Sequence, residues 1–187
     1  MKLILGSGSP RRKEILTRIG YTFEIMTADV VESDDDSLGL EGLSLYNAKL
    51  KAEAVYNELE APSNIVIGSD TVVWLDGKAY GKPKDKKEAH RFLRELSGKT
   101  HHVGTGVAIV TNEETQLFCE IADVTFKALT DEDISSYITD IPVMDKAGSY
   151  AIQDGGDRII DHYEGEFETI MGLPFARLKT ELASYNL

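Results

Sequence analysis

The chain alternates between short apolar runs and polar or glycine-rich stretches, and the first of these runs define one unit. The apolar run at 2–5 predicts a short buried strand, and the apolar spacing over 11–19 predicts an amphipathic helix. Ser9 suits the N-cap of this helix, Pro10 suits its first position because no N–H is needed there, and Gly20 suits its end. The chain therefore begins as a strand, a glycine–serine loop and a helix.

The remaining apolar periodicities predict further strands and helices. The dipeptide Asp76-Gly77 between two strand-like runs predicts a tight hairpin turn, and the segment 33–42 has the least regular pattern. Hairpins and strand–helix units in one chain indicate an α/β fold with a mixed sheet. We predict further strands at 21–26, 65–75, 79–80, 103–111 and 115–127, and further helices at 43–59, 85–96, 130–137 and 175–185.

Composition agrees with an ordinary globular protein, since 42% of the residues are apolar and 28% are charged. A length of 187 residues suits one compact domain, which we expect to span residues 1–187. The first residues turn polar too early for the apolar core of a signal peptide, and no run approaches the roughly 18 apolar residues of a membrane span. We therefore predict a soluble, cytoplasmic protein that does not bind membranes.

The net charge of −12 argues against binding of nucleic-acid polymers, because affinity for a phosphate backbone needs a broad face of Lys and Arg. Much of the acidity, including the run Asp34-Asp35-Asp36, suits solvated surface. The single Cys119 has no disulfide partner, and the histidines lack the spacing of a zinc site. A local basic cluster is more informative, since a positive site in a negative protein suits an anion.

The first candidate site is the loop and helix start Ser7-Gly8-Ser9-Pro10-Arg11-Arg12-Lys13. A helix N-terminus offers unpaired N–H groups and the positive end of the helix dipole, to which these side chains add hydroxyls and cations. Phosphate is the natural ligand, because guanidinium groups bind phosphate oxygens in pairs. The alternative is a capped surface helix whose cations face solvent.

Asp70 is the second candidate, because apolar strand residues flank it on both sides. A buried carboxylate is costly unless it has a partner, a metal or a catalytic task. The alternative to a functional role is a structural ion pair with a Lys or Arg. Asp70 is therefore the best single candidate for a catalytic residue.

Two lysines and one polar turn complete the candidates. Lys82 lies between glycine and proline, on a stiff turn that can aim its ammonium into a cleft, and Lys51 lies in a predicted helix. The segment from Asp145 and Lys146 to Gln153 is expected to form a turn that leads into a strand, and its polar groups suit a base and its phosphates. The alternatives are ordinary surface lysines and a salt-bridged turn.

Taken in order along nearly the whole chain, these segments resemble the Maf family of nucleoside triphosphate pyrophosphatases. The resemblance implies a curled mixed β-sheet flanked by helices, with two lobes around a cleft, and a homodimer. The segments that carry it are Ser7-Gly8-Ser9-Pro10-Arg11-Arg12-Lys13, Glu32, Lys51, Gly68-Ser69-Asp70-Thr71-Val72, Gly81-Lys82-Pro83, Leu96-Ser97-Gly98, Asp145-Lys146-Ala147-Gly148-Ser149-Tyr150 and Gly172-Leu173-Pro174.

The resemblance also implies roles for individual residues. Asp70 matches the general base and metal-site carboxylate, and Glu32 matches the second acidic metal ligand. Val31 stands where the family often has Asp, directly before that Glu. The family's phosphate-contacting positions correspond to Arg11, Arg12, Lys51 and Lys82.

The implied activity is hydrolysis of a nucleoside triphosphate to the monophosphate and pyrophosphate, with Mg²⁺ or Mn²⁺ as the divalent metal. Asp70 would activate a water for attack at the α-phosphorus, while the cations stabilise the departing pyrophosphate. Arg11, Thr71 and Gln153 match the branch of the family that acts on dTTP and UTP, which implies a preference for these substrates.

Two other functions are open at this stage. A nucleotide-binding regulator of septum formation would bind without turnover, and a different phosphohydrolase would cut between the β- and γ-phosphates. Asp70 among basic residues favours an enzyme, because a binding protein does not need a carboxylate beside the phosphates. The sequence leaves open whether the role is nucleotide-pool housekeeping, removal of modified nucleotides or control of cell division.

Overall fold

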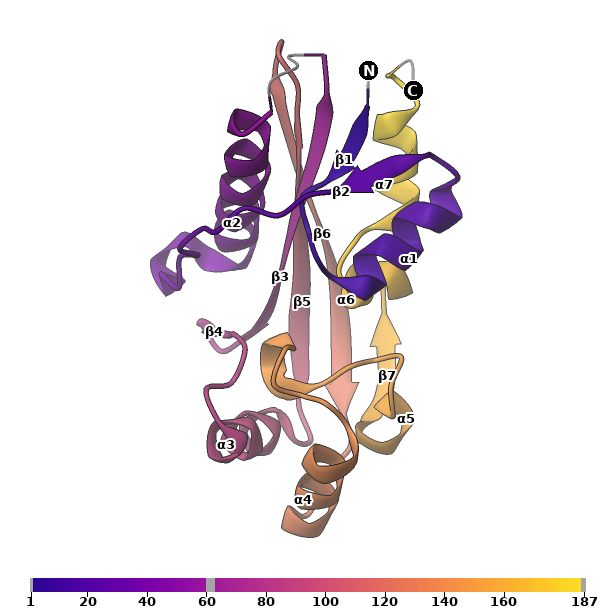
Figure 1. Ribbon diagram of the computed structural model, residues 1–187. Helices are drawn as coiled ribbons and strands as arrows, with labels where there is room; N and C mark the ends of the chain where they lie inside the picture. Colours follow the sequence, from indigo (N-terminus) through magenta and orange to yellow (C-terminus); the bar gives the residue numbers. More distant parts are fainter. Residues whose placement is uncertain (1, 60–62, 186–187) are drawn as a thin grey trace.

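Three long strands run through the middle of the molecule from one end to the other (Figure 1). They are β3 (Ile65–Leu75), β5 (Thr100–Val110) and β6 (Thr115–Phe126), and they form two antiparallel pairs in the computed structural model, which describes residues 2–59 and 63–185. Nearly every residue of β3 and most of β5 are buried, because other elements cover both faces of these strands. A polar residue on either strand therefore lies inside the molecule.

Shorter strands extend this core into a seven-stranded mixed sheet. β1 (Leu3–Leu5) pairs in parallel with both β2 (Phe23–Ile25) and β3, while β4 (Lys78–Tyr80) returns antiparallel along β3. β7 (Ile160–Glu164) pairs antiparallel with β6, which gives the order β2-β1-β3-β5-β6-β7. The predicted mixed sheet is confirmed.

The first lobe consists of the upper half of the sheet in Figure 1 and the helices that cover it. The helix α2 (Gly39–Asn57), preceded by the 3₁₀ turn η1 (Asp36–Leu38), covers one face. On the other side α1 (Pro10–Ile19), α6 (Phe167–Met171) and α7 (Phe175–Leu182) lie together. Alternate side chains of β3 reach the two sides, since Ile67 packs in the cluster with Leu16 and Leu178, whereas Val66 packs with Ala48.

Two glycines let α2 lie directly against the sheet. A Cβ atom added to Gly68 would lie 2.3 Å from the carbonyl oxygen of Ala48, and one added to Gly106 would lie 2.5 Å from that of Ser44. Only glycine permits an approach this close. Because α2 is so near, its side chains at Asn47 and Lys51 reach the middle of β3.

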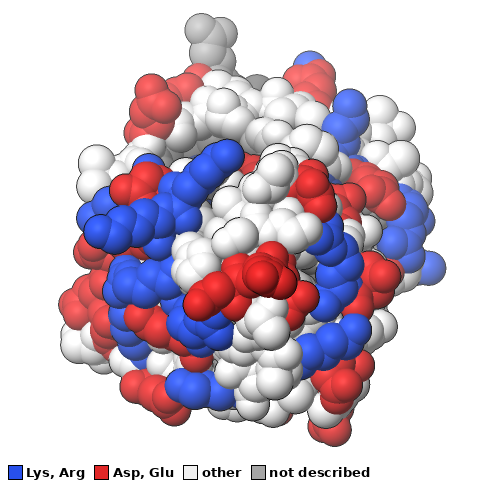
Figure 2. Space-filling model, turned by 90° about the horizontal axis from the view of Figure 1, so that it is seen from below, with Lys and Arg blue, Asp and Glu red and all other residues white. Residues whose placement is uncertain are grey.

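The second lobe surrounds the lower half of the sheet with α3 (Lys86–Leu96), α4 (Asp131–Asp140), α5 (Gly156–Ile159) and the 3₁₀ turn η2 (Ala147–Ser149). Its core includes several aromatic side chains, among them Phe92, Phe126, Tyr137 and Tyr150. Figure 2 shows this end of the molecule, where Lys and Arg side chains lie on both sides of the view, interspersed with Asp and Glu, and those on the left lie on the side of α3.

Local signals in the sequence placed several turns and helix starts correctly. Asp76 and Gly77 have φ values of 53° and 80°, as the predicted tight turn between β3 and β4 requires. The Asp85 carboxylate accepts a hydrogen bond from the Glu88 N–H at 2.7 Å, which confirms the predicted start of α3. Ser9 occupies the N-cap position of α1, but its side chain makes no capping bond.

Several predictions about elements are corrected by the structure. The segment after Tyr150 is not a strand, because the N–H of Ala151 is satisfied by the hydroxyl of Tyr137 at 3.2 Å. β7 was not predicted because it is an edge strand with mostly exposed residues, and the short helices α5 and α6 were also not predicted. α2 begins at Gly39 instead of 43, and α4 continues to Asp140 instead of 137. None of the helices in the described residues is long and apolar enough to span a bilayer.

Candidate active site

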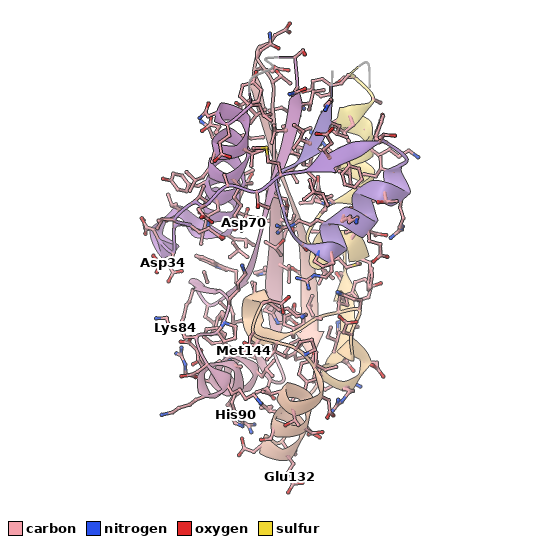
Figure 3. The ribbon with its side chains drawn as sticks, in the orientation of Figure 1. Asp34, Asp70, Lys84, His90, Glu132 and Met144 are labelled. Atoms are coloured by element: carbon pink, nitrogen blue, oxygen red, sulfur yellow. The ribbon has the colours of Figure 1, made fainter. Side chains whose placement is uncertain are left out.

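One cavity of about 940 Å³ lies where the two lobes meet, and Asp70 is at the middle of the sheet beside it (Figure 3). The loop after β1, the middle of β3 and the segment before α5 all contribute to its wall. All but one of the predicted site residues line it, and these are Ser7, Ser9, Arg11, Arg12, Glu32, Lys51, Asp70, Thr71, Lys82, Asp145, Lys146 and Gln153.

Asp70 is a buried carboxylate held between two side chains of α2. Its Oδ1 atom lies 2.6 Å from the ammonium of Lys51, and its Oδ2 atom accepts a hydrogen bond of 3.4 Å from the amide of Asn47. Burial raises the pKa of Asp70 above its ordinary value, while the charges of Lys51 and Arg12 oppose this effect. The site therefore holds a carboxylate whose basicity is increased by burial.

Lys51 joins the two acidic residues predicted to bind the metal. Its side chain is 16% exposed, and its ammonium lies 3.0 Å from Oε2 of Glu32 as well as 2.6 Å from Oδ1 of Asp70. Burial acts to raise the pKa of Glu32, but the charges of Lys51 and Lys82 outweigh it and hold that pKa below its ordinary value. The predicted alternative of an Asp70–lysine ion pair is thus present, within a larger cluster that faces a cavity.

Arg12 is fixed by three acceptors from different parts of the chain. Nε donates to the carbonyl oxygen of Gly172 at 2.8 Å, Nη1 to the hydroxyl of Ser7 at 3.1 Å, and Nη2 to that of Thr71 at 3.2 Å. A guanidinium carries five N–H donors, so two are left for an anion in the cavity. Burial lowers the pKa of Arg12, and the nearby Asp70 counteracts this.

Across the cavity mouth, α1 faces the segment before α5. Arg11 Nη1 lies 3.9 Å from Oδ2 of Asp145, whose Oδ1 accepts a hydrogen bond of 2.8 Å from Lys146. The Lys146 ammonium also donates to the carbonyl oxygen of Pro142, and the side chain is 5% exposed. Burial acts to raise the pKa of Asp145, but its bond to Lys146 holds that pKa below its ordinary value. Lys146 therefore braces its own loop, while Arg11 and Asp145 remain at the cavity surface.

The other predicted residues differ in their surroundings. Lys82 is exposed at the wall of the cavity, where its charge acts on Glu32. Gln153 is half-buried, and its amide makes no hydrogen bond within residues 2–59 and 63–185. Lys13 is exposed on α1 and does not line the cavity, because successive residues of a helix point in different directions.

The two acidic residues suit a divalent cation. Glu32 and Asp70 already direct one oxygen each at the same positive charge, that of Lys51. Mg²⁺ commonly uses one or two protein carboxylates and takes its other oxygens from water and substrate phosphates. Within the described part of the chain, no group of three or more His, Cys, Asp and Glu could hold a metal. A bound triphosphate would therefore have to complete the coordination.

Comparison with known proteins identifies the chain's relatives. A family model described as Maf-like protein matches residues 2–185. The chain belongs to the Maf family. Relatives named dTTP/UTP pyrophosphatase occur in Akkermansia muciniphila, 45% identical over 92% of this chain and 90% of the relative, and in Bacillus anthracis, 42% identical over 100% and 96%. The predicted family is confirmed, and the predicted enzyme class agrees with the names of these relatives.

A solved structure supports the fold. The Staphylococcus aureus Ham1 protein has a TM-score of 0.58 to this Maf family chain at 14% identity, with 98% of this chain and 99% of that chain covered. At this level of identity the likeness concerns the fold alone. The predicted curled mixed sheet flanked by helices is confirmed.

Sequence reasoning missed several buried polar residues of this Maf family site. Asn47 touches Asp70 directly, and Ser69 donates to the carbonyl oxygen of Gly172 at 2.9 Å. Thr105 donates to the carbonyl oxygen of Thr169 at 2.7 Å and contacts the Thr71 hydroxyl at 3.0 Å. Ser69 and Thr105 are polar residues within buried strands, which is the same signal that identified Asp70, whereas the helix that carries Asn47 gives no such signal.

Proposed function

We propose that this chain is a cytoplasmic nucleoside triphosphate pyrophosphatase that hydrolyses dTTP and UTP to the monophosphate and pyrophosphate with Mg²⁺ or Mn²⁺. The observation that carries the proposal is the convergence, in one cavity, of the buried Asp70 carboxylate with Lys51 and Arg12. The names of its relatives, dTTP/UTP pyrophosphatase, give independent support. Residues 1–187 act as one catalytic domain in this proposal.

The triphosphate binds at the N-terminus of α1. Backbone N–H groups there and the helix dipole attract anions, and Arg12 keeps two N–H donors for phosphate oxygens. Ser7, Ser9, Arg11 and Lys82 line the same cavity. Because Arg12 is already fixed by protein acceptors, little of its side-chain freedom is lost on binding, which favours productive orientation.

Asp70 is the general base. Oδ1 is occupied by Lys51, whereas Oδ2 accepts a long bond of 3.4 Å from Asn47, so Oδ2 is the atom more available to accept a proton from water. A pKa raised by burial makes the ionised carboxylate a stronger base. Water attacks the α-phosphorus while Lys51, Lys82 and the arginines stabilise the charge of the departing pyrophosphate.

Glu32 and Asp70 would hold the divalent metal, which would supply positive charge to offset the negative charge of the phosphates. These two residues meet at one cation in the present arrangement, which supports the assignment. Mg²⁺ and Mn²⁺ both accept hard oxygen ligands.

Gln153 reads the nucleobase. Its amide offers a donor and an acceptor side by side, which complements O4 and N3–H of uracil or thymine. Purine bases are larger and have a different hydrogen-bonding edge from that of uracil and thymine. Because no neighbour in the described residues fixes the orientation of this amide, it can turn to meet cytosine as well. We therefore expect discrimination against purine triphosphates and 7-methyl-GTP to exceed discrimination against CTP.

The proposal includes a homodimer, which follows from the family resemblance and is tested by light scattering during size exclusion. It excludes nucleic-acid polymers as partners, because the chain has a net charge of −12.

The decisive experiment is a panel of nucleotides with Mg²⁺ and with Mn²⁺, in which orthophosphate and pyrophosphate are measured separately. We expect equal amounts of monophosphate and pyrophosphate, fastest from dTTP and UTP. Diphosphate with orthophosphate would support hydrolysis between the β- and γ-phosphates instead. Nucleotide binding without any product would support the alternative of a non-catalytic regulator of septum formation.

A further inference from the structure

Asn47 connects two parts of the active site that are distant in sequence. Its side chain lies on α2 and is almost completely buried. Oδ1 accepts a hydrogen bond of 2.8 Å from the N–H of Ser33, and Nδ2 donates to the carbonyl oxygen of Ser33 at 3.0 Å. Nδ2 also donates to Oδ2 of Asp70 at 3.4 Å. One amide thus holds the residue after Glu32 at both of its backbone groups and contacts the proposed base.

The segment that carries Glu32 needs such a connection. Residues 26–35 contain no helix or strand, and the Glu32 side chain is 42% exposed. Burial therefore does little to fix Glu32, and its position depends on its contacts. Two contacts with the segment come from a single face of α2, since Lys51 binds the Glu32 carboxylate and Asn47, four residues earlier, binds the backbone of Ser33.

The two contacts differ in how they respond to a bound cation. Lys51 occupies the same carboxylate oxygens, of Glu32 and Asp70, that a divalent cation would use, so ammonium and metal compete. Asn47 is neutral and holds the Glu32 segment through the backbone of Ser33. Its connection does not depend on those oxygens.

We propose that Asn47 is a positioning residue that fixes the spacing between Glu32 and Asp70 and so sets the affinity for the divalent metal. This inference rests on the proposed function. Hydrogen-bonding partners of ligating carboxylates orient them, and losing such a partner typically costs about 10–100-fold in metal affinity or activity. An unheld segment would also have to be ordered on each binding event, which weakens binding further.

The main test is Asn47→Leu, which keeps a similar shape and removes all three hydrogen bonds. Asn57→Leu is the matched control, since Asn57 lies exposed at the end of the same helix. We expect Asn47→Leu to raise the half-saturating Mg²⁺ concentration for pyrophosphate release about tenfold, with kcat at saturating Mg²⁺ less affected. Mn²⁺ binding, followed by the electron paramagnetic resonance of free Mn²⁺, should weaken by a similar factor.

A second pair of variants changes the other partner of the Asn47–Ser33 hydrogen bond, which is Ser33. Ser33→Pro removes the N–H that donates to Asn47, whereas Ser33→Ala keeps it and removes only the hydroxyl. Ser33 lies in the surface segment, so these proteins should fold even if Asn47→Leu does not. Ser33→Pro should weaken Mn²⁺ binding and Ser33→Ala should not. Amide hydrogen exchange should become faster in residues 29–35 of Asn47→Leu and Ser33→Pro.

The outcomes separate this inference from the proposed function. Lower thermal stability of Asn47→Leu with unchanged Mg²⁺ and Mn²⁺ dependence would show a merely structural role and overturn the inference. Equal behaviour of Ser33→Pro and Ser33→Ala would do the same. If the wild-type protein neither binds Mn²⁺ nor releases pyrophosphate, the proposed function fails, whereas the exchange measurement still reports whether Asn47 holds the segment.

Discussion

Asp70 and His101 are buried ionisable residues on neighbouring strands, but their surroundings are opposite. Asp70 on β3 faces a cavity and contacts Lys51 and Asn47. His101 on β5 packs against the rings of Phe126 and Tyr150, at centroid distances of 4.9 and 5.4 Å. Its Nε2 atom contacts the Tyr150 hydroxyl at 2.8 Å, while Nδ1 has no partner in the described residues.

Burial acts against the charged form of both side chains. It lowers the pKa of His101 to about 3, and it raises the pKa of Asp70. The two residues differ in the nearby charges that oppose the effect of burial on the pKa. Lys51 and Arg12 do so for Asp70, whereas for His101 the weaker charge effect of Asp123 does so. His101 is therefore a neutral part of the core at ordinary pH. A buried ionisable group indicates a reaction site only where opposite charges and a cavity accompany it.

The largest effect should follow from removing the negative charge of Asp70. We expect Asp70→Asn to lower kcat/KM for UTP by at least about 10²-fold, because the amide cannot accept a proton from water. The protein should still fold, since the substitution is nearly isosteric and Lys51 keeps its ion pair with Glu32 at 3.0 Å, although removing one partner of a buried pair should cost some stability. Pyrophosphate release and thermal melting measure the two effects.

Asp76→Asn is the matched control for this change, because Asp76 is an exposed residue in the turn after the same strand. It should retain wild-type activity. A folded Asp70→Asn protein with undiminished turnover would remove Asp70 from the mechanism.

Removing the nearest cation of Asp70, the ammonium of Lys51, should have the next largest effect. Lys51→Met leaves the Asp70 carboxylate without its nearest cation, and breaking a buried pair from one side typically costs about 3–5 kcal/mol of unfolding free energy. Urea denaturation measures the loss. Lys49→Met, which breaks an exposed pair with Glu53, should cost less than about 1 kcal/mol.

The double variant Lys51→Met/Asp70→Asn tests the cause of that loss. If the uncompensated carboxylate is responsible, the double variant should recover most of the stability. Equal instability of the single and double variants would instead assign the effect to packing of the lysine chain.

The sequence alone predicted the main elements of the fold, because long periodic segments are dominated by burial of one face. It also identified Asp70, since burying a carboxylate in an apolar strand costs free energy unless the group has a partner or a function. Asn47 was missed, because one asparagine in a helix reveals nothing of a bond to Ser33 and Asp70. That bond depends on the close packing of α2 against Gly68 and Gly106, which is a tertiary feature.

The unpredicted strand and the misplaced lysine have similar explanations. β7 consists mostly of exposed polar residues, and its pairing with β6 is not encoded in its own pattern. Lys13 is part of a basic run in sequence, but the helix turns it away from the cavity that Arg11 and Arg12 line. The local sequence pattern predicts a helix or strand, but tertiary packing decides which of its side chains reach the cavity.

A smaller effect is expected at the nucleobase. Gln153→Glu replaces the donor opposite O4 of uracil with a second acceptor, so kcat/KM for UTP should fall about tenfold. Gln153→Met removes the hydrogen bonds without adding charge, and it should lower UTP turnover without favouring CTP. An unchanged kcat/KM for UTP in Gln153→Glu would exclude contact between this side chain and the base.

The last effect is absent at neutral pH, because it concerns stability in acid and arises from His101. The unfolded chain binds a proton at this residue near its ordinary pKa of 6.5, whereas the folded protein binds it only near 3. Between these pH values the unfolded state binds more protons than the folded state. The contribution of neutral His101 to the free energy of unfolding is therefore complete above about pH 6.5 and is lost as the pH falls toward 3. His101→Gln keeps a polar group near Tyr150 and cannot be protonated. Its melting temperature should therefore fall less than that of the wild type between pH 7 and 4.5. His162→Gln, at an exposed position, should follow the wild-type curve. Equal slopes for all three proteins would show that the burial of His101 does not contribute to acid sensitivity.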